Sequence, residues 1–421
     1  MKKLLLLLVL LGTLSVGCTE DMLDGLKDII GNPDNEQPNI ADICVPNNEI
    51  WYTNGSTTEA TTPHKTNVFG ANIVSNTYDV AKECWVIKFD GKVTTIGDCA
   101  FLDCSSLTSV TIPDRVTTIG YIAFCDCSSL TSVTIPDGVT SIGDYAFYDC
   151  SSLTSVTIPD SVTTIEYAIF GGCSNLTEFN GKYASEDGRC LIIDGALNSF
   201  APAGLTEYTI PVSVTTIGNY AFYDCDSLTS ITIPDSVTTI GNYAFYDCDS
   251  LTSITIPDSV TTIGDEAFFD CSSLTSVTIP DSVTTIGSGA FARCRSLTSV
   301  TIPDSVTSIG VSAFYECSSL TSVTIGDSVT TIGYGAFFCC SSLTNVTIPD
   351  RVTTIGELAF AWCSSLTSVY CKAVTPPAGD YRMFDDNASG RKIYVPMESV
   401  EAYKYAEGWS DYKSYIVGYN F

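Results

Sequence analysis

The sequence has few basic residues and almost no histidine. Of its 421 residues, 19 are Lys or Arg and 48 are Asp or Glu, giving a formal net charge of −29, and His64 is the single histidine. Binding to phosphate groups needs clustered Lys and Arg, so the composition argues against a nucleic-acid partner and against attraction to an anionic membrane surface. A zinc site would combine cysteine clusters with histidine, and the sequence offers one histidine only.

Signatures of catalysis are missing as well. The sequence contains no G-x-S-x-G and no catalytic-cysteine motif, and its glycines recur mainly at one position of the repeat rather than in a phosphate-binding loop. His64 lies in the polar stretch TTPHKTN, with no nucleophile at a telling spacing. We therefore expect a surface-loop histidine, no enzymatic activity, no metal and no cofactor.

The N-terminal apolar run is too short to span a bilayer. A basic start precedes apolar residues 4–11, and small residues lead to Ser15-Val16-Gly17-Cys18. This layout is typical of a secretory signal peptide, and its end resembles the lipobox of bacterial lipoproteins, in which the cysteine is lipidated. The sequence predicts a signal peptide at 1–17, a lipid anchor on Cys18, and a flexible tether at 18–43 that is rich in Asp, Glu, Asn and Pro.

A 23-residue unit dominates the rest of the chain. It reads V-T-x-I-G-x-x-A-F-x-x-C-x-x-L-T-x-V-T-I-P-D-x, and its first valine recurs every 23 residues from Val93 to Val352, except for one step of 52 between Val162 and Val214. A fixed period in this range indicates a solenoid. One Phe and one Leu position never vary, from Phe101 and Leu107 onwards. Such columns predict coils that stack with like side chains over like, in one shared core.

The local pattern predicts the shape of each coil. In the unit that contains Val277, the alternation of SVTI favours a strand that ends at Pro280, and a turn follows at Asp281. Residues 283–286 form a weaker second strand, and Ala290-Phe291 with a cysteine three residues on predicts one helical turn. A single coil buries too few large side chains to offset the entropy of ordering its backbone, so each coil needs its neighbours.

The repeated pattern resembles a known family. C-x-x-L-x-x-V-x-I-P-x-x-V-x-x-I-G-x-x-A-F, which recurs over about residues 85–374, is similar to the leucine-rich repeat of BspA-type bacterial surface proteins. NNEIWYTNG at 47–55 and KIYVPMESVEAYKYAEGWSDY at 392–412 resemble the ends of that family. The resemblance implies a right-handed, curved solenoid that is exposed at the bacterial surface and binds other macromolecules.

The expected fold is therefore a right-handed leucine-rich-repeat coil, β-rich with a short helical turn in each repeat and capped at both ends. We place an N-terminal β-rich cap at 44–84, the solenoid at 85–375 and a C-terminal cap at 376–421. The irregular long coil at 178–211 is interpreted as a bulged loop or small hairpin rather than a domain boundary.

Two columns at coil spacing have both a structural and a chemical interpretation. Cysteines recur from Cys104 to Cys363, either as a ladder of metal ligands or disulfides, or as small buried hydrophobic residues; parallel side chains suit disulfide torsions poorly, and we favour burial. Aspartates recur from Asp114 to Asp350 and could hold Ca²⁺. Because the GGxGxD pattern of calcium-binding repeats is absent, we interpret them as turn residues.

An outward face of small hydroxyl residues is the candidate binding surface. It consists of Thr232, Thr255, Thr278, Thr301 and Thr324 together with Ser253, Ser276 and Ser299. In leucine-rich repeats the corresponding sheet face usually carries the ligand, although threonine also simply suits exposed strand positions. A rival surface is the aromatic edge beside the expected helical turn, which comprises Tyr145, Tyr148, Tyr220, Tyr223, Tyr243, Tyr246, Tyr315 and Trp362.

These features together predict a lipid-anchored protein of the bacterial outer membrane, facing outward at the cell surface. Its expected role is adhesion to host or neighbouring-cell macromolecules, through an extracellular protein or glycan ligand. The alternative is a passive structural spacer or coat lipoprotein without a defined ligand.

Overall fold

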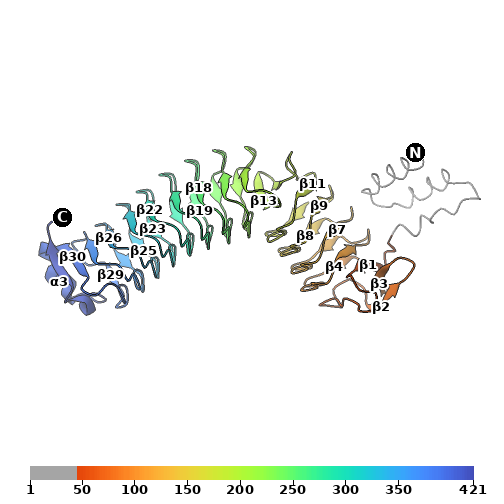
Figure 1. Ribbon diagram of the computed structural model, residues 1–421, viewed down its shortest axis with the longest axis horizontal. Coiled ribbons are helices and arrows are strands. Elements are labelled where there is room, and N and C mark those ends of the chain that lie inside the picture. Colours follow the sequence, from red (N-terminus) through yellow and green to blue (C-terminus); the bar gives the residue numbers. More distant parts are fainter. Residues whose placement is uncertain (1–44) are drawn as a thin grey trace, which may run out of the picture. The chain divides into compact units, whose positions relative to one another are not determined.

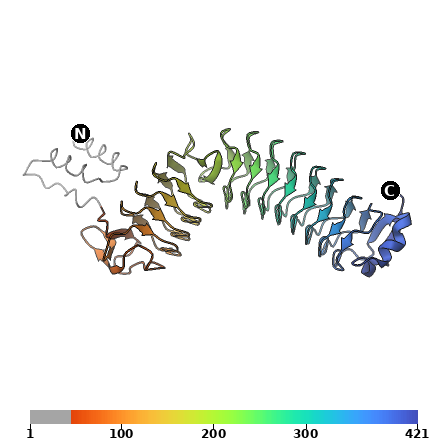
Figure 2. The ribbon, with the colours of Figure 1, turned by 180° about the vertical axis from the view of Figure 1, so that it is seen from behind.

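The computed structural model describes residues 45–421. The predicted signal peptide, Cys18 and the tether lie outside the described residues. The chain divides into two compact units on either side of the Arg189–Cys190 bond. Each unit is a stack of coils, and each coil contributes one strand to a first row and one shorter strand to a second row (Figure 1, Figure 2).

The N-terminal unit begins with an antiparallel sheet. Its strands are β1 (Glu49–Thr53), β2 (Ile73–Asp79) and β3 (Cys84–Phe89), in the order β2-β3-β1. Strand β1 also pairs antiparallel with β5, so this sheet covers the first coil. The first-row strands that follow are β5 (Ser109–Thr111), β7 (Ser132–Thr134), β9 (Ser155–Ile158) and β11 (Glu178–Gly181). The second-row strands are β4 (Thr95–Ile96), β6 (Thr118–Ile119), β8 (Ser141–Ile142) and β10 (Thr164–Ile165).

The C-terminal unit opens with a hairpin and continues with parallel strands. The hairpin consists of β12 (Cys190–Ile193) and β13 (Ala196–Phe200). The first row contains β14 (Glu207–Thr209), β16 (Ser230–Thr232), β18 (Ser253–Thr255), β20 (Ser276–Thr278), β22 (Ser299–Ile302), β24 (Ser322–Ile325), β26 (Asn345–Ile348), β28 (Ser368–Cys371), β30 (Lys392–Pro396) and β31 (Ile416–Tyr419). The second row contains β15 (Thr216–Ile217), β17 (Thr239–Ile240), β19 (Thr262–Ile263), β21 (Thr285–Ile286), β23 (Ser308–Ile309), β25 (Thr331–Ile332), β27 (Thr354–Ile355) and β29 (Ala378–Gly379).

The irregular coil contains the hairpin that the sequence suggested. Strands β12 and β13 pair antiparallel with a shift of register between Leu191 and Ile192. The chain also divides into its two units at this place, which the interpretation as a loop or hairpin alone did not predict.

The core consists of the predicted columns. In the C-terminal unit, successive repeat phenylalanines from Phe222 to Phe384 stack nearly parallel, with ring centroids 4.9 to 5.7 Å apart. In the N-terminal unit, Phe101 to Phe170 stack in the same way at 5.1 to 5.5 Å. Every repeat leucine is fully buried. The predicted shared core of stacked Phe and Leu side chains is therefore present within each of the two units.

The short helical turn predicted for each repeat is wrong. In the coil of Phe268, the segment after Gly264 is a chain of turns in which Glu266 and Asp270 both have a φ of +51°. The N–H groups of residues 266, 268 and 270 donate to carbonyls of the next coil over 2.7, 2.8 and 2.9 Å. A helix would need these donors for bonds within its own segment. Here they build a third ladder of hydrogen bonds between coils.

A small helical segment lies between the last two strands of the C-terminal unit, β30 and β31. It comprises η2 (Met397–Ser399), α3 (Val400–Tyr405) and η3 (Ser410–Tyr412). Tyr403 donates to the carbonyl of Ala373 over 2.7 Å, and the Trp409 indole N–H donates to that of Pro377 over 2.8 Å. Both side chains are fully buried, so they cover the last coil. Among residues 45–421, no helix has the length and apolar character needed to cross a membrane.

Candidate functional site

The predicted serines and threonines form one exposed surface of the C-terminal unit. In β20, Val277 is buried while Ser276 and Thr278 are exposed, because successive strand residues point to opposite sides. The parallel register aligns Ser253 with Ser276 and Thr255 with Thr278. We call the surface formed by Ser253, Ser276, Ser299, Thr232, Thr255, Thr278, Thr301 and Thr324 the hydroxyl face; all eight side chains are exposed.

The hydroxyl groups of this face are not used to hold the coils together. Two other columns of hydroxyl side chains do hold the coils together. The side chain of Thr275 donates to the carbonyl of Thr252 over 3.1 Å, and that of Ser282 donates to the carbonyl of Val260 over 2.7 Å. Within residues 45–421, the hydroxyls of the hydroxyl face make no such side-chain hydrogen bond. They remain available to a ligand, in rows separated by the strand spacing of about 4.8 Å.

Comparison with known proteins places this architecture in a family. A family model described as the BspA type leucine rich repeat region, in six copies, matches residues 54–185, 196–305 and 284–406. The chain belongs to the BspA-type leucine-rich-repeat family. This membership confirms the resemblance on which the expected fold was based.

Solved structures of other bacterial repeat proteins are similar to this BspA-type chain. A leucine-rich repeat protein from Bacteroides ovatus is 27% identical with a TM-score of 0.54, over 83% of this chain and 90% of that one. A leucine-rich repeat protein from Eubacterium ventriosum is 30% identical with a TM-score of 0.54, over 66% of this chain and 82% of that one. The search of curated proteins gave no match.

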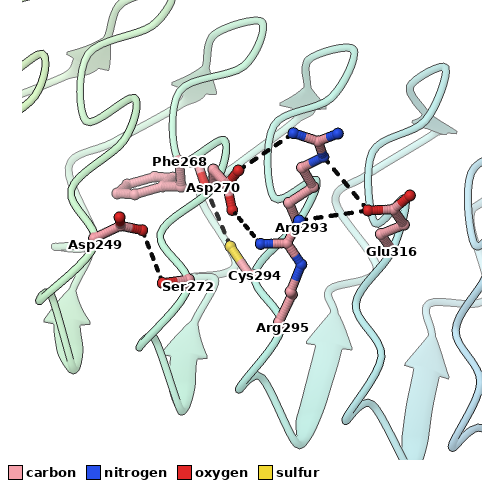
Figure 3. A network of polar contacts seen from close by, with 8 residues as sticks. All are labelled: Asp249, Phe268, Asp270, Ser272, Arg293, Cys294, Arg295 and Glu316. Carbon is pink, nitrogen blue, oxygen red and sulfur yellow. Dashed lines mark hydrogen bonds and ion pairs between the residues drawn. The ribbon is translucent and has the colours of Figure 1, made fainter.

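The repeated cysteines of the BspA-type coils are buried thiols. All 17 cysteines among residues 45–421 are free. The Cys294 thiol donates to the carbonyl of Phe268 in the preceding coil over 3.2 Å (Figure 3). In the same way, the Cys271 thiol donates to the carbonyl of Phe245 over 3.1 Å. Burial and then the neighbouring thiols raise the pKa of Cys271 well above its ordinary value, so the proton needed for this bond stays in place. The structure therefore favours the interpretation as buried residues and adds a hydrogen-bonding role.

On the aromatic edge, most of the aromatic rings stack on the corresponding ring of the next coil. Tyr220 and Tyr243 stack with centroids 4.6 Å apart, and Tyr223, Tyr246 and Phe269 form a column at 5.4 and 4.7 Å. These side chains are half-buried. Their faces cover each other from coil to coil, which favours a role in covering the turn segments over a role as a binding surface. The exception is Trp362, which is 54% exposed.

An ion-pair network on this edge was missed by the sequence analysis. Arg295 lies 3.0 Å from Asp270, and Arg293 lies 3.4 Å from both Asp270 and Glu316 (Figure 3). The Arg293 guanidinium also lies over the Phe269 ring, 5.4 Å from its centroid. The signal was present, because residues 270, 293 and 316 are spaced by the repeat period.

In the coils that precede Arg293 and Arg295, several carboxylates lie close together on the aromatic edge. Burial, and then the nearby Asp270, Asp249 and Asp226, raise the pKa of Asp247 to about 6. In the N-terminal unit, burial and Asp126 raise the pKa of Asp149 to about 6. Stacked coils bring like charges together in this column, which makes part of the stability dependent on pH.

The remaining candidates are His64 and the aspartate column. His64 is exposed, in the predicted surface loop. Within the described part of the chain, no group of three His, Cys, Asp or Glu residues is arranged to hold a metal ion. In the aspartate column, Asp304 accepts a hydrogen bond from the backbone N–H of Asp327 over 2.7 Å, which is turn chemistry between coils.

Proposed function

We propose that the protein is a lipid-anchored adhesion protein of the bacterial outer membrane, which faces outward and binds an extracellular protein or glycan through the hydroxyl face. The observation that carries this proposal is the pair of exposed hydroxyl rows whose hydrogen-bonding capacity the fold leaves unused, in contrast to the neighbouring threonine columns. Family membership supports the general role, since the repeat architecture is that of bacterial leucine-rich-repeat proteins.

The signal-peptide pattern and Cys18 supply the anchor in this proposal. Long, shallow faces with a repeated side-chain pattern suit extended partners, because many weak contacts act together once the first has formed. The uncharged face lies on a protein of net charge −29, which disfavours anionic partners, and the face itself carries no carboxylate to pair with a cationic one.

The test is retention of the full chain on a panel of immobilised glycans and extracellular-matrix proteins. A variant with Thr255→Glu, Thr278→Glu and Thr301→Glu places three carboxylates on the hydroxyl face. We expect it to lose the retention of the parent protein, because each glutamate adds charge and bulk to the surface that meets the ligand.

The matched control is Thr285→Glu, Ser308→Glu and Thr354→Glu. These three residues are also exposed, but they lie in second-row strands, so the control adds the same charge outside the hydroxyl face. Retention that the control loses equally would contradict the assignment of the face. A parent protein that no member of the panel retains would favour the alternative of a passive spacer.

A further inference from the structure

The threonine column of the hydroxyl face ends at a tyrosine. The parallel register aligns Thr301 with Thr324 in strands β22 and β24, and it aligns Thr347 with Tyr370 in β26 and β28. Tyr370 is aligned in turn with Tyr394 in β30. A row of short side chains therefore meets a tall aromatic one, which forms a step on the otherwise flat face.

The exposed side of this step is the face of the Tyr370 ring. Tyr370 and Tyr394 stack with centroids 4.7 Å apart and an interplanar angle of 12°. Because neighbouring strands are also about 4.7–4.9 Å apart, the ring faces are turned along the direction in which the coils stack. Tyr394 covers one face of Tyr370, and Tyr419 meets both rings edge-on at 5.6 and 5.5 Å.

The opposite face of Tyr370 looks towards the short side chain of Thr347. Among residues 45–421, Tyr394 and Tyr419 are the two rings that contact Tyr370, so no other ring covers this face. Asn345 and Thr347 of β26 lie on this side, and Thr324 of β24 lies one repeat period before Thr347, so these three residues form the floor in front of the ring. We call these three residues and the Tyr370 ring the corner.

The corner combines groups that suit a neutral sugar. A pyranose ring has an apolar C–H surface that can lie on an aromatic face, while its hydroxyls both donate and accept hydrogen bonds. The hydroxyls of Thr324 and Thr347 make no side-chain hydrogen bond within residues 45–421, and the floor carries no charge. If an apolar surface of a protein ligand covered these threonine hydroxyls, they would lose water without gaining a hydrogen-bond partner. The hydroxyls of a sugar would supply that partner.

A protein ligand fits the corner less well. Protein interfaces concentrate their affinity in several Trp, Tyr or Arg anchors that become fully desolvated. The hydroxyl face has no aromatic side chain before Tyr370. The charged residues aligned with its serine column lie at its two ends, Glu207 in β14 and Lys392 in β30, one strand beyond Tyr370. A polyanion is opposed by the net charge of −29.

We infer that the corner binds a neutral polysaccharide, with one sugar ring stacked on Tyr370 and its hydroxyls bonded to Thr324 and Thr347. This inference rests on the proposed function, since it names the ligand class of the same face. The chain of sugars extends from the corner along the hydroxyl face, away from Tyr394.

The decisive variant is Tyr370→Thr, because it places at this position the residue that the preceding coils already have. It removes the wall of the corner and keeps the repeat pattern, and thermal unfolding checks that the variant is folded. The matched control is Tyr370→Phe, which keeps the ring; the Tyr370 hydroxyl makes no hydrogen bond to the described residues.

The measurement is affinity electrophoresis of the full chain in gels that contain soluble starch, dextran, galactomannan or hydroxyethyl cellulose. We expect at least one of these neutral polysaccharides to retard the parent protein. Tyr370→Thr should bind it about tenfold more weakly, the loss that corresponds to about 1.4 kcal/mol, and Tyr370→Phe should match the parent. Heparin, an anionic control, should cause no retardation.

Two results would overturn the inference, namely no retardation by any of the four polysaccharides, or equal retardation of parent and Tyr370→Thr. If matrix proteins alone are retained and the triple glutamate variant of the hydroxyl face loses them, the proposed function stands and the sugar corner fails. If neither polysaccharides nor panel proteins bind, both proposals fail.

Discussion

Replacing Cys271 by alanine should destabilise the C-terminal unit by about 2 kcal/mol, because a hydrogen bond and a buried sulfur are both lost. The Cys271 side chain is fully buried, and its thiol lies 3.1 Å from the carbonyl of Phe245. The remaining donor to that carbonyl is the Cys248 N–H, at 3.4 Å. Losing one neutral hydrogen bond costs about 0.5–1.5 kcal/mol. A methyl-sized void adds about 1 kcal/mol.

The assay is equilibrium unfolding in urea at neutral pH with a reducing agent, where the midpoint reports the loss. Cys339→Ala is the matched control, since Cys339 is half-exposed and its thiol makes no hydrogen bond within residues 45–421; a change below about 0.5 kcal/mol is expected. Cys317→Ala lies two coils from Cys271 in the same column, so the double variant should lose about 4 kcal/mol. If Cys271→Ala unfolds no more easily than the control, the thiol ladder does not stabilise the fold.

Three further outcomes are expected. The pKa of Asp247 is about 6 in the folded chain, above its ordinary 3.8, so the stability from this group is complete below about pH 4 and is lost as the pH rises through 6. In dilute buffer, the melting temperature should fall between about pH 4 and pH 6, and Asp247→Asn should reduce that fall. The double variant Arg293→Ala, Arg295→Ala should lose about 1 kcal/mol of stability at low ionic strength and almost nothing in about 1 M salt. Arg351 is exposed and has no ion pair within residues 45–421, so Arg351→Ala should leave the stability unchanged at both salt concentrations; equal losses would contradict the network. Cys18→Ala should move the protein from the membrane fraction to the soluble fraction on cell fractionation, and a variant that still sediments with membranes would contradict the lipid anchor.

The core and strands of each coil could be predicted because they depend on local patterns. The alternation around Val277 and the constant Phe and Leu positions specify which side chains are buried, and the structure places them as expected. The turn segment could not be predicted in the same way. Residues as different as Tyr243, Glu266 and Leu358 have positive φ at one repeat position, and glycine appears there only at Gly289 and Gly335 in the C-terminal unit. Hydrogen bonds to the next coil hold this backbone, and such bonds leave no composition signal.

For the candidate site too, the features that depend on local sequence could be predicted, and those that depend on contacts between coils could not. That Ser276 and Thr278 point outward follows from strand alternation. Thr275, which precedes Ser276 in sequence, donates a side-chain hydrogen bond to the preceding coil, whereas Ser276 and Thr278 do not. This difference depends on the distances between coils, which the sequence of one repeat does not reveal. The Arg293 network was within reach, because adding or subtracting one period leads from Arg293 to its two acidic partners.

The ladder of hydrogen bonds along the turn segments gives the C-terminal unit a net dipole parallel to the direction in which the coils stack. Each peptide group in it directs its N–H towards the following coil and its carbonyl towards the preceding one, from Tyr220, which donates to Asn242, to Trp362, which donates to Asp385. Peptide dipoles largely cancel in an ordinary β-sheet, but here they add, as they do along an α-helix. The positive pole falls at the coil that carries Asp385 and Asp386, where carboxylates are favoured. A cation is favoured at the opposite pole, near Tyr220, and lengthening the stack would move the two poles apart without changing their sign.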